Sequence, residues 1–148
     1  MRFELSQEEE KSLEPIMTAL SDRAGHRITL AYLLDRWFWF VGAVEQGYDD
    51  SIYEYTNDLS VRDLLESVID ACPAPLGNRL MDRLGEWDGR FLKATAPWPK
   101  PLLTQEGSEE PSWWWVRVPV RLGTELEKDL KEIAPAPFLN SQQGALPE

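Results

Sequence analysis

Residues 29–44 read TLAYLLDRWFWFVGAV, and this most apolar stretch of the chain decides the fold. Asp35 and Arg36 interrupt it, so it falls short of the roughly 20 apolar residues that a membrane-spanning helix requires. Apolar side chains on nearly every face are typical of a helix that other elements surround. Trp37 and Trp39 lie about 200° apart on a helical wheel. We therefore expect a central helix that is packed on two sides, with both indoles in the core.

Further helices are predicted on both sides of this stretch. Ser6 and Glu9 match a capping box that opens a first helix, and Gly25 closes that helix. After the central helix, residues 51–57 form a short segment and Ser60 opens a new helix. The helix after that has one apolar face at helical spacing: Leu76, Leu80, Leu84, Trp87 and Phe91.

The C-terminal part combines strand, helix and tail signals. Residues 113–121 alternate in a way that predicts a Trp-rich extended strap or edge strand, since Pro119 cannot donate to a central ladder. Residues 2–5 offer a short N-terminal strand as its partner, and pairing with a second copy in a homodimer is the alternative. The prediction is a mainly α single domain over residues 1–134, with four to five helices around the central one. Residues 135–148 are expected to be a disordered tail.

Tryptophan is the unusual residue type here, because seven in 148 residues is about three to four times the average usage. On a strand, Trp113 and Trp115 share one side with Arg117 and Arg121. In one interpretation Trp98 and the proline-rich strap fold over these indoles while Arg117 covers them by cation–π contact. In the other, this side is a partner or ligand surface, since Trp and Arg often dominate binding energy.

A second candidate surface is acidic. Asp50, Glu54 and Asp58 follow one another at four-residue spacing, and Asp49 is adjacent. On a helix these carboxylates stack along one face, where oxygen ligands could in principle hold a divalent cation. No calcium-loop pattern accompanies them, so we predict no metal site. We expect a solvated face first, and an acidic patch for protein binding as the functional alternative.

Composition disfavours several classes of function. Lys and Arg total 15 against 26 Asp and Glu, and the net charge of -11 opposes binding to nucleic acid or to anionic membranes. One cysteine and one histidine, Cys72 and His26, allow neither a disulfide nor a Cys/His metal cluster. Gly-rich phosphate loops are missing, so we predict no cofactor. No catalytic constellation is evident, and the acidic start of the chain lacks a signal-peptide pattern, which favours the cytoplasm.

These observations favour a non-enzymatic acidic interaction protein with a basic protein partner. Its most concrete form is an antitoxin-like or immunity-like inhibitor, because acidic surfaces speed encounter with basic ones. The alternative is a small-molecule binding domain or an enzyme. Its pocket would be lined by Trp98, Trp113 and Trp115, with Arg117 or Arg121 holding an anionic group.

Overall fold

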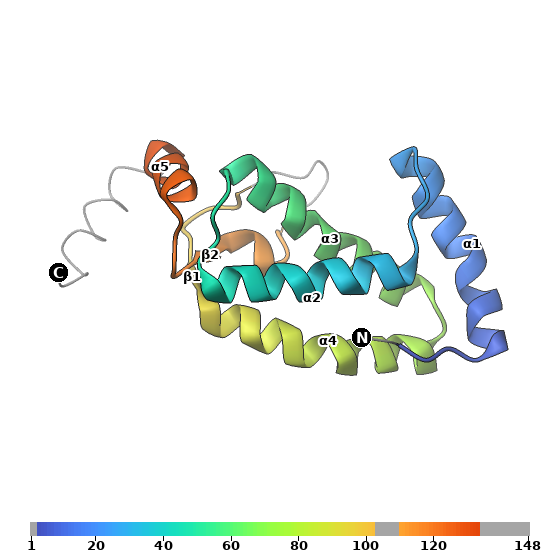
Figure 1. The fold of residues 1–148 in the computed structure, drawn as a ribbon. Helices are drawn as coiled ribbons and strands as arrows, with labels where there is room; N and C mark the ends of the chain where they lie inside the picture. Colours follow the sequence, from blue (N-terminus) through green and yellow to red (C-terminus); the bar gives the residue numbers. More distant parts are fainter. Residues whose placement is uncertain (1–2, 103–109, 134–148) are drawn as a thin grey trace.

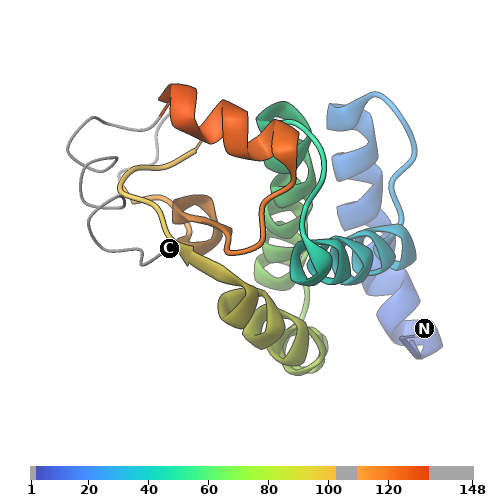
Figure 2. The ribbon, with the colours of Figure 1, turned by 60° about the vertical axis from the view of Figure 1, so that its left-hand side comes forward.

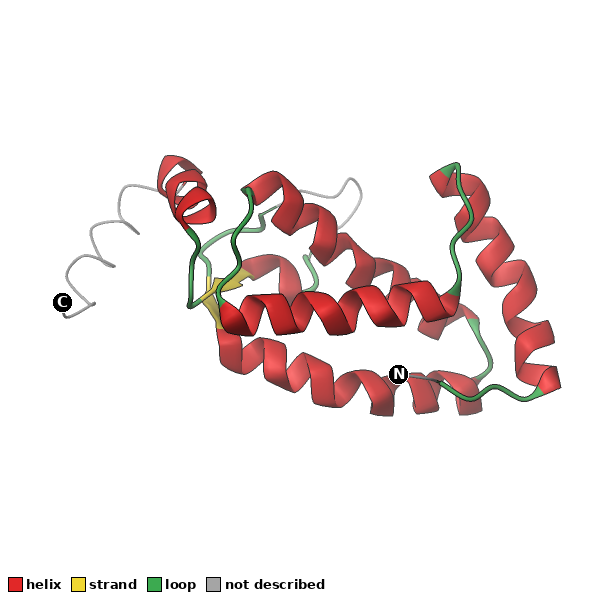
Figure 3. Cartoon of the chain, viewed as in Figure 1, coloured by secondary structure: helices red, strands yellow, loops and turns green. Residues whose placement is uncertain are grey.

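The computed structural model describes residues 3–102 and 110–133, and most of these lie in α-helices (Figures 1 and 3). The helices are α1 (Gln7–Ala24), α2 (Leu30–Gln46), α3 (Ile52–Ala71), α4 (Ala74–Ala94) and α5 (Thr124–Ile133). A 3₁₀ helix, η1 (Trp113–Val116), and two short strands, β1 (Thr95–Pro97) and β2 (Arg117–Pro119), complete the described part. The predicted mainly helical fold is confirmed. The predicted tail, residues 135–148, lies outside the described residues.

Helix α2 is central, as its apolar composition predicted. It packs against α3 and α4, while α1 and α5 lie near opposite ends of α3 (Figures 1 and 2). Trp37 is completely buried, but Trp39 is 60% exposed, so the prediction that both indoles lie in the core is wrong for Trp39. The reason is geometric: α3 and α4 cover two flanks of α2 and leave a third face open. No helix in the described ranges is long and apolar enough to cross a membrane.

Local signals place α1 and α4 correctly. The Ser6 hydroxyl accepts from the Glu9 amide at 3.1 Å, and the Glu9 carboxylate accepts from the Ser6 amide at 2.9 Å. Gly25 ends α1 at a φ of 79°, a left-handed conformation that glycine adopts without strain. On α4 all the side chains of the predicted apolar face are buried: Leu76, Leu80, Leu84, Trp87 and Phe91.

Helix α3 is one continuous element, so the prediction of a short segment followed by a new helix at Ser60 is wrong. Ser51 caps α3, because its hydroxyl accepts from the Glu54 amide at 3.1 Å. Ser60 lies inside the helix and donates its hydroxyl proton to the carbonyl of Asn57. A serine can bond one turn back within a helix in this way, so its presence does not require a helix start.

The Trp-rich segment is a strand only in its second half. Residues 113–116 form a 3₁₀ turn, and β2 pairs antiparallel with β1 in the register Thr95–Pro119, Ala96–Val118 and Pro97–Arg117. The predicted N-terminal strand is therefore wrong, since Phe3 to Leu5 are not in a strand. The partner strand is β1, which directly follows α4, and β2 runs antiparallel to it later in the chain.

Candidate functional site

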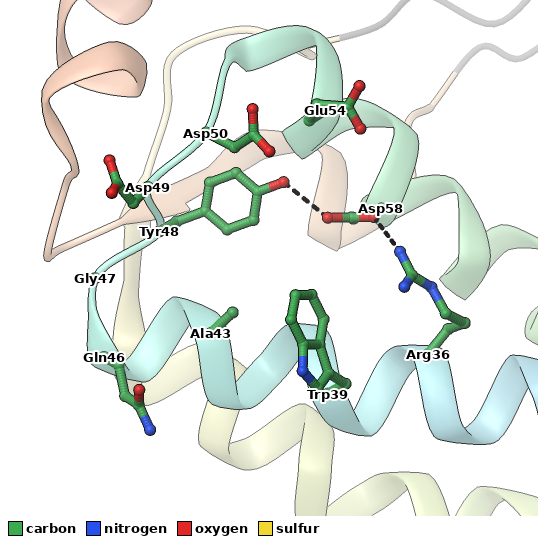
Figure 4. A pocket seen from close by; sticks show the side chains of 10 residues that line it. All are labelled: Arg36, Trp39, Ala43, Gln46, Gly47, Tyr48, Asp49, Asp50, Glu54 and Asp58. Carbon is green, nitrogen blue, oxygen red and sulfur yellow. Dashed lines mark hydrogen bonds and ion pairs between the residues drawn. The ribbon is translucent and has the colours of Figure 1, made fainter.

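An acidic cleft opens where the end of α2 meets the start of α3. It has a volume of about 350 Å³ and is shown in Figure 4. The structure brings together in it all four residues of the predicted acidic patch: Asp49, Asp50, Glu54 and Asp58. Helix α2 contributes Arg36 and Trp39 to the opposite wall. We call this site the acidic cleft.

Asp58 is the innermost carboxylate of the acidic cleft. It is only 7% exposed, so the expected solvated face does not extend to this residue. Its Oδ2 accepts from the Tyr48 hydroxyl at 2.7 Å, and its Oδ1 accepts from Nη2 of Arg36 at 2.9 Å. Asp58 follows Glu54 by four residues, which on a helix is one full turn plus about 40°. On α3 that rotation carries Asp58 toward α2.

Tyr48 holds the Asp58 carboxylate from the loop after α2. Burial, followed by its hydrogen bond to Asp58, raises the pKa of Tyr48 above its ordinary value. The phenol therefore remains a proton donor to the carboxylate. Its ring also packs edge-on against Tyr55 and Phe40, with centroids 5.2 and 5.6 Å apart. The inner wall of the acidic cleft is thus part of the core.

The loop that carries Asp49 and Asp50 is held by the C-terminal part of the chain. The Gly123 amide donates to the Tyr48 carbonyl at 2.8 Å. A Cβ at Gly123 would stand 2.6 Å from the Cα of Asp49, so only glycine allows this approach. Asp129 of α5 accepts from the Ile52 amide at 2.9 Å and so caps α3. Sequence reasoning missed this role of Asp129, because its partner is 77 positions away.

Arg36 and Trp39 also line the acidic cleft, although the sequence predicted Trp39 as a core residue and gave Arg36 no role in a site. The guanidinium carbon of Arg36 lies 5.5 Å from the centroid of the Trp39 ring, within cation–π range. In Figure 4 the indole extends from α2 toward Tyr48 and Asp58. Their three-residue spacing on one helix was the available signal, because it places both side chains on the same face.

The Trp113–Trp115 cluster turns inward. Trp114 donates to Asp63 at 2.8 Å, and Trp115 donates to both oxygens of the same carboxylate at 3.0 and 3.1 Å. On a strand the two side chains would face opposite ways, whereas a 3₁₀ turn separates successive side chains by only about 120°. Trp115 is 1% exposed and Trp98 is 7% exposed, so neither offers a contact surface.

The remaining residues of the predicted Trp/Arg surface are more accessible. Trp113 is half-buried against Trp114 and Phe91, with centroids 5.4 and 6.0 Å apart. Arg117 is half-buried and Arg121 is exposed. The structure therefore does not bring the predicted surface residues together on one open face.

Arg117 and Arg121 bind backbone carbonyls at helix ends. Arg117 donates to the Thr95 hydroxyl at 2.7 Å, and to the carbonyls of Thr95 and Leu92 at 2.8 and 3.2 Å. It thereby adds a charged donor where α4 ends, beside the Thr95 amide that already donates to the Leu92 carbonyl. Arg121 donates to the Glu45 carbonyl near the end of α2 at 3.3 Å.

The cation over the tryptophan cluster is Arg62, not the expected Arg117. Its guanidinium carbon lies 4.6 Å from the Trp114 ring, and its side chain is 3% exposed. Arg62 also pairs with Asp88 at 2.9 Å, and Asp88 accepts from the Trp37 indole at 3.0 Å. Burial opposes the charge of Arg62, but the hydrogen bonds to Asp88 and Glu66 leave its pKa raised. This network joins α2, α3 and α4.

The residues considered for metal binding and for catalysis do not form a site in the described part of the chain. Within residues 3–102 and 110–133, no group of three or more His, Cys, Asp and Glu side chains is arranged to hold a metal ion. Cys72 is buried, and burial raises the pKa of its thiol. His26 is exposed, with its Nδ1 3.3 Å from the Arg27 carbonyl. Neither residue lines the acidic cleft.

Compared with known proteins, the chain matches no family model, and no curated protein or solved structure matches it significantly.

Proposed function

We propose that this chain is a non-enzymatic interaction protein that binds a basic protein through the acidic cleft. Its most concrete form is an immunity-like or antitoxin-like inhibitor acting in the cytoplasm. The observation that carries the proposal is the composition of the cleft: four carboxylates and an exposed indole face one cavity, against a single guanidinium, that of Arg36.

The charges support a basic partner. The chain as a whole carries -11, so long-range attraction brings a basic protein toward it, and the acidic cleft is where carboxylates converge. Trp39 adds a large apolar contact at the same place, and tryptophan is the residue type most often found to dominate binding energy. Charge supplies speed and orientation, while the indole supplies affinity.

The alternative, a small-molecule pocket lined by Trp98, Trp113 and Trp115, has less support. Two of these indoles are buried, and Trp115 already bonds to Asp63. Arg117 bonds to the end of α4, so it does not point a guanidinium into an open cavity. No specific observation favours this second function.

Capture of the partner from the native host tests the proposal. The purified chain is compared with an Asp50→Asn, Glu54→Gln variant of the acidic cleft. The matched control is Asp22→Asn, Glu14→Gln on α1, which changes the net charge equally at exposed positions outside the cleft. We expect a basic protein that is retained by the wild type and the control, is lost from the cleft variant, and is released at high salt.

Equal retention by all three chains would contradict the proposal, because binding would then not depend on the cleft. An acidic partner, or one whose binding resists high salt and both sets of substitutions, would contradict it as well.

A further inference from the structure

We propose that the acidic cleft recognises an arginine side chain of the basic partner, in preference to lysine, and that Arg36 occupies part of that position in the free protein. This inference rests on the proposed function, because it names the group that the cleft accepts. It is carried by the contact between a guanidinium and the cleft that the structure already contains.

Arg36 shows how the cleft holds a guanidinium. Its Nη2 donates to Oδ1 of Asp58 at 2.9 Å, while its guanidinium carbon lies 5.5 Å from the centroid of the Trp39 ring. One planar cation thus meets a carboxylate and an indole at once. Both partners line the same cavity (Figure 4). The cleft therefore has the two groups that recognise a guanidinium.

Capacity for a second cation remains after Arg36 is bound. Trp39 is still 60% exposed. Within the described part of the chain, Asp49, Asp50 and Glu54 form no ion pair, although all three line the cavity. An incoming basic side chain thus meets unneutralised carboxylates beside an open aromatic ring.

Arginine suits this arrangement better than lysine. A guanidinium is planar, stacks on an indole, and donates in parallel to carboxylate oxygens, whereas an ammonium is a compact and strongly hydrated point charge. Both ions gain from the carboxylates, but only arginine gains fully from Trp39. The indole of Trp39 therefore accounts for the preference for arginine over lysine, and the carboxylates account for the attraction of either cation.

Arg36 is a competitor that can be displaced. Its side chain is 38% exposed and can swing into solvent, whereas that of Asp58 is only 9% exposed, so Arg36 leaves readily only when another cation replaces it at Asp58. When Arg36 moves aside, Asp58 keeps its hydrogen bond from Tyr48. A partner arginine can then take the place on Trp39 and Asp58 that Arg36 held.

The experiment compares octa-arginine with octa-lysine, two peptides of equal length and charge, by titration calorimetry of the full chain. The indole N–H resonance of Trp39, assigned by its absence in Trp39→Leu, reports whether the peptide reaches the cleft. We expect octa-arginine to bind at least about threefold more tightly than octa-lysine. Arg36→Met, which removes the internal competitor, is expected to widen that difference.

Two variants separate the indole from the carboxylates. Trp39→Leu is expected to bind both peptides with equal, charge-driven affinity. Tyr53→Leu is the matched control, because Tyr53 is an exposed aromatic residue of α3 that does not line the cavity, and it should keep the preference. Asp50→Asn, Glu54→Gln should weaken both peptides together.

The outcomes distinguish the two proposals. Equal affinity for the two peptides in the wild type, or a preference that survives in Trp39→Leu, overturns the arginine inference and leaves the acidic interaction protein standing. Binding of both peptides that is insensitive to Asp50→Asn, Glu54→Gln overturns the proposed cleft and the arginine inference together. If Trp39→Leu does not fold, an unchanged peptide preference in Arg36→Met overturns the role of Arg36.

Discussion

The indole of Trp115 donates hydrogen bonds of 3.0 and 3.1 Å to the two carboxylate oxygens of Asp63, a residue 52 positions earlier in the chain. Trp114 donates to the same carboxylate at 2.8 Å. One aspartate of α3 therefore fixes two adjacent indoles of η1. Because the 3₁₀ turn aims both rings at Asp63, the Trp-rich segment becomes part of the core rather than an open surface.

Replacing Asp63 tests this anchoring role. Asp63→Ala leaves two buried indole N–H groups without their acceptor, and each such group costs roughly 1–3 kcal/mol. We expect the free energy of unfolding, measured by urea denaturation, to fall by about 2–6 kcal/mol. Asp70→Ala, at an exposed position on the same helix, should have little effect. Equal stability of the two variants would show that Asp63 is not an anchor.

Asp88 has a comparable role between α2 and α3. Asp88→Ala leaves Arg62 buried without this partner and removes the acceptor of the Trp37 indole. Breaking a buried ion pair from one side costs about 3–5 kcal/mol. Chemical denaturation of this variant should show a loss of that order, and Asp82→Ala, an exposed position of α4, should not. A decrease in the free energy of unfolding below about 1 kcal/mol would indicate that the Arg62–Asp88 pair is exposed to solvent rather than buried.

Leu65 and Trp39 should differ in their contribution to stability. Leu65 is completely buried, so Leu65→Ala creates a cavity that costs about 2–5 kcal/mol. Trp39→Ala removes an exposed ring, and the expected cost stays below about 1 kcal/mol. Thermal melts of the two variants against the wild type measure the difference. A larger loss of stability in Trp39→Ala than in Leu65→Ala would mean that a different face of α2 packs against the core.

Arg117 should prove structural. Arg117→Met removes the hydrogen bonds to Thr95 and to the Leu92 carbonyl and is expected to lower the free energy of unfolding by about 1–3 kcal/mol. Arg121→Met removes one exposed bond of 3.3 Å and should change stability much less. If Arg117→Met unfolds at the wild-type denaturant concentration, the end of α4 does not depend on this side chain.

Alkaline pH should destabilise the fold through Tyr48 and Tyr55. Burial raises the pKa of both phenols above the ordinary value, so the folded state holds their protons more tightly than the unfolded state. The stabilising contribution is complete below about pH 10, the unfolded value, and declines as pH rises above it. Phenolate absorbance and circular dichroism, followed together, should show these tyrosines ionising only with unfolding.

The double variant Tyr48→Phe, Tyr55→Phe provides the control for the pH experiment. It should lose the part of the phenolate signal that coincides with unfolding. Full ionisation of all four tyrosines in the wild type, with the circular dichroism spectrum unchanged, would contradict the burial of these two rings.

Local patterns in the sequence were sufficient to predict several helices. The Ser6 and Glu9 capping box predicted the start of α1, because both of its hydrogen bonds join residues three positions apart. The apolar face of α4 followed from helical spacing alone. The grouping of Asp49, Asp50, Glu54 and Asp58 was also visible, because the last three follow one another at four-residue spacing and Asp49 is adjacent. Whether their surface binds a partner stays a prediction.

The sequence by itself determined the helical class, the central position of α2 and the acidity of the chain, because each depends on composition or on short-range periodicity. Only the tertiary structure decided which acidic residues are buried and which indole is exposed. Asp58, Asp63 and Asp88 have identical side chains, yet their partners Arg36, Trp115 and Trp37 lie 22, 52 and 51 positions away. Hydrogen bonds over such separations form only after the elements pack. The packing of α2 against α3 and α4 decides the cases of Asp58 and Asp88, and the packing of η1 against α3 decides that of Asp63.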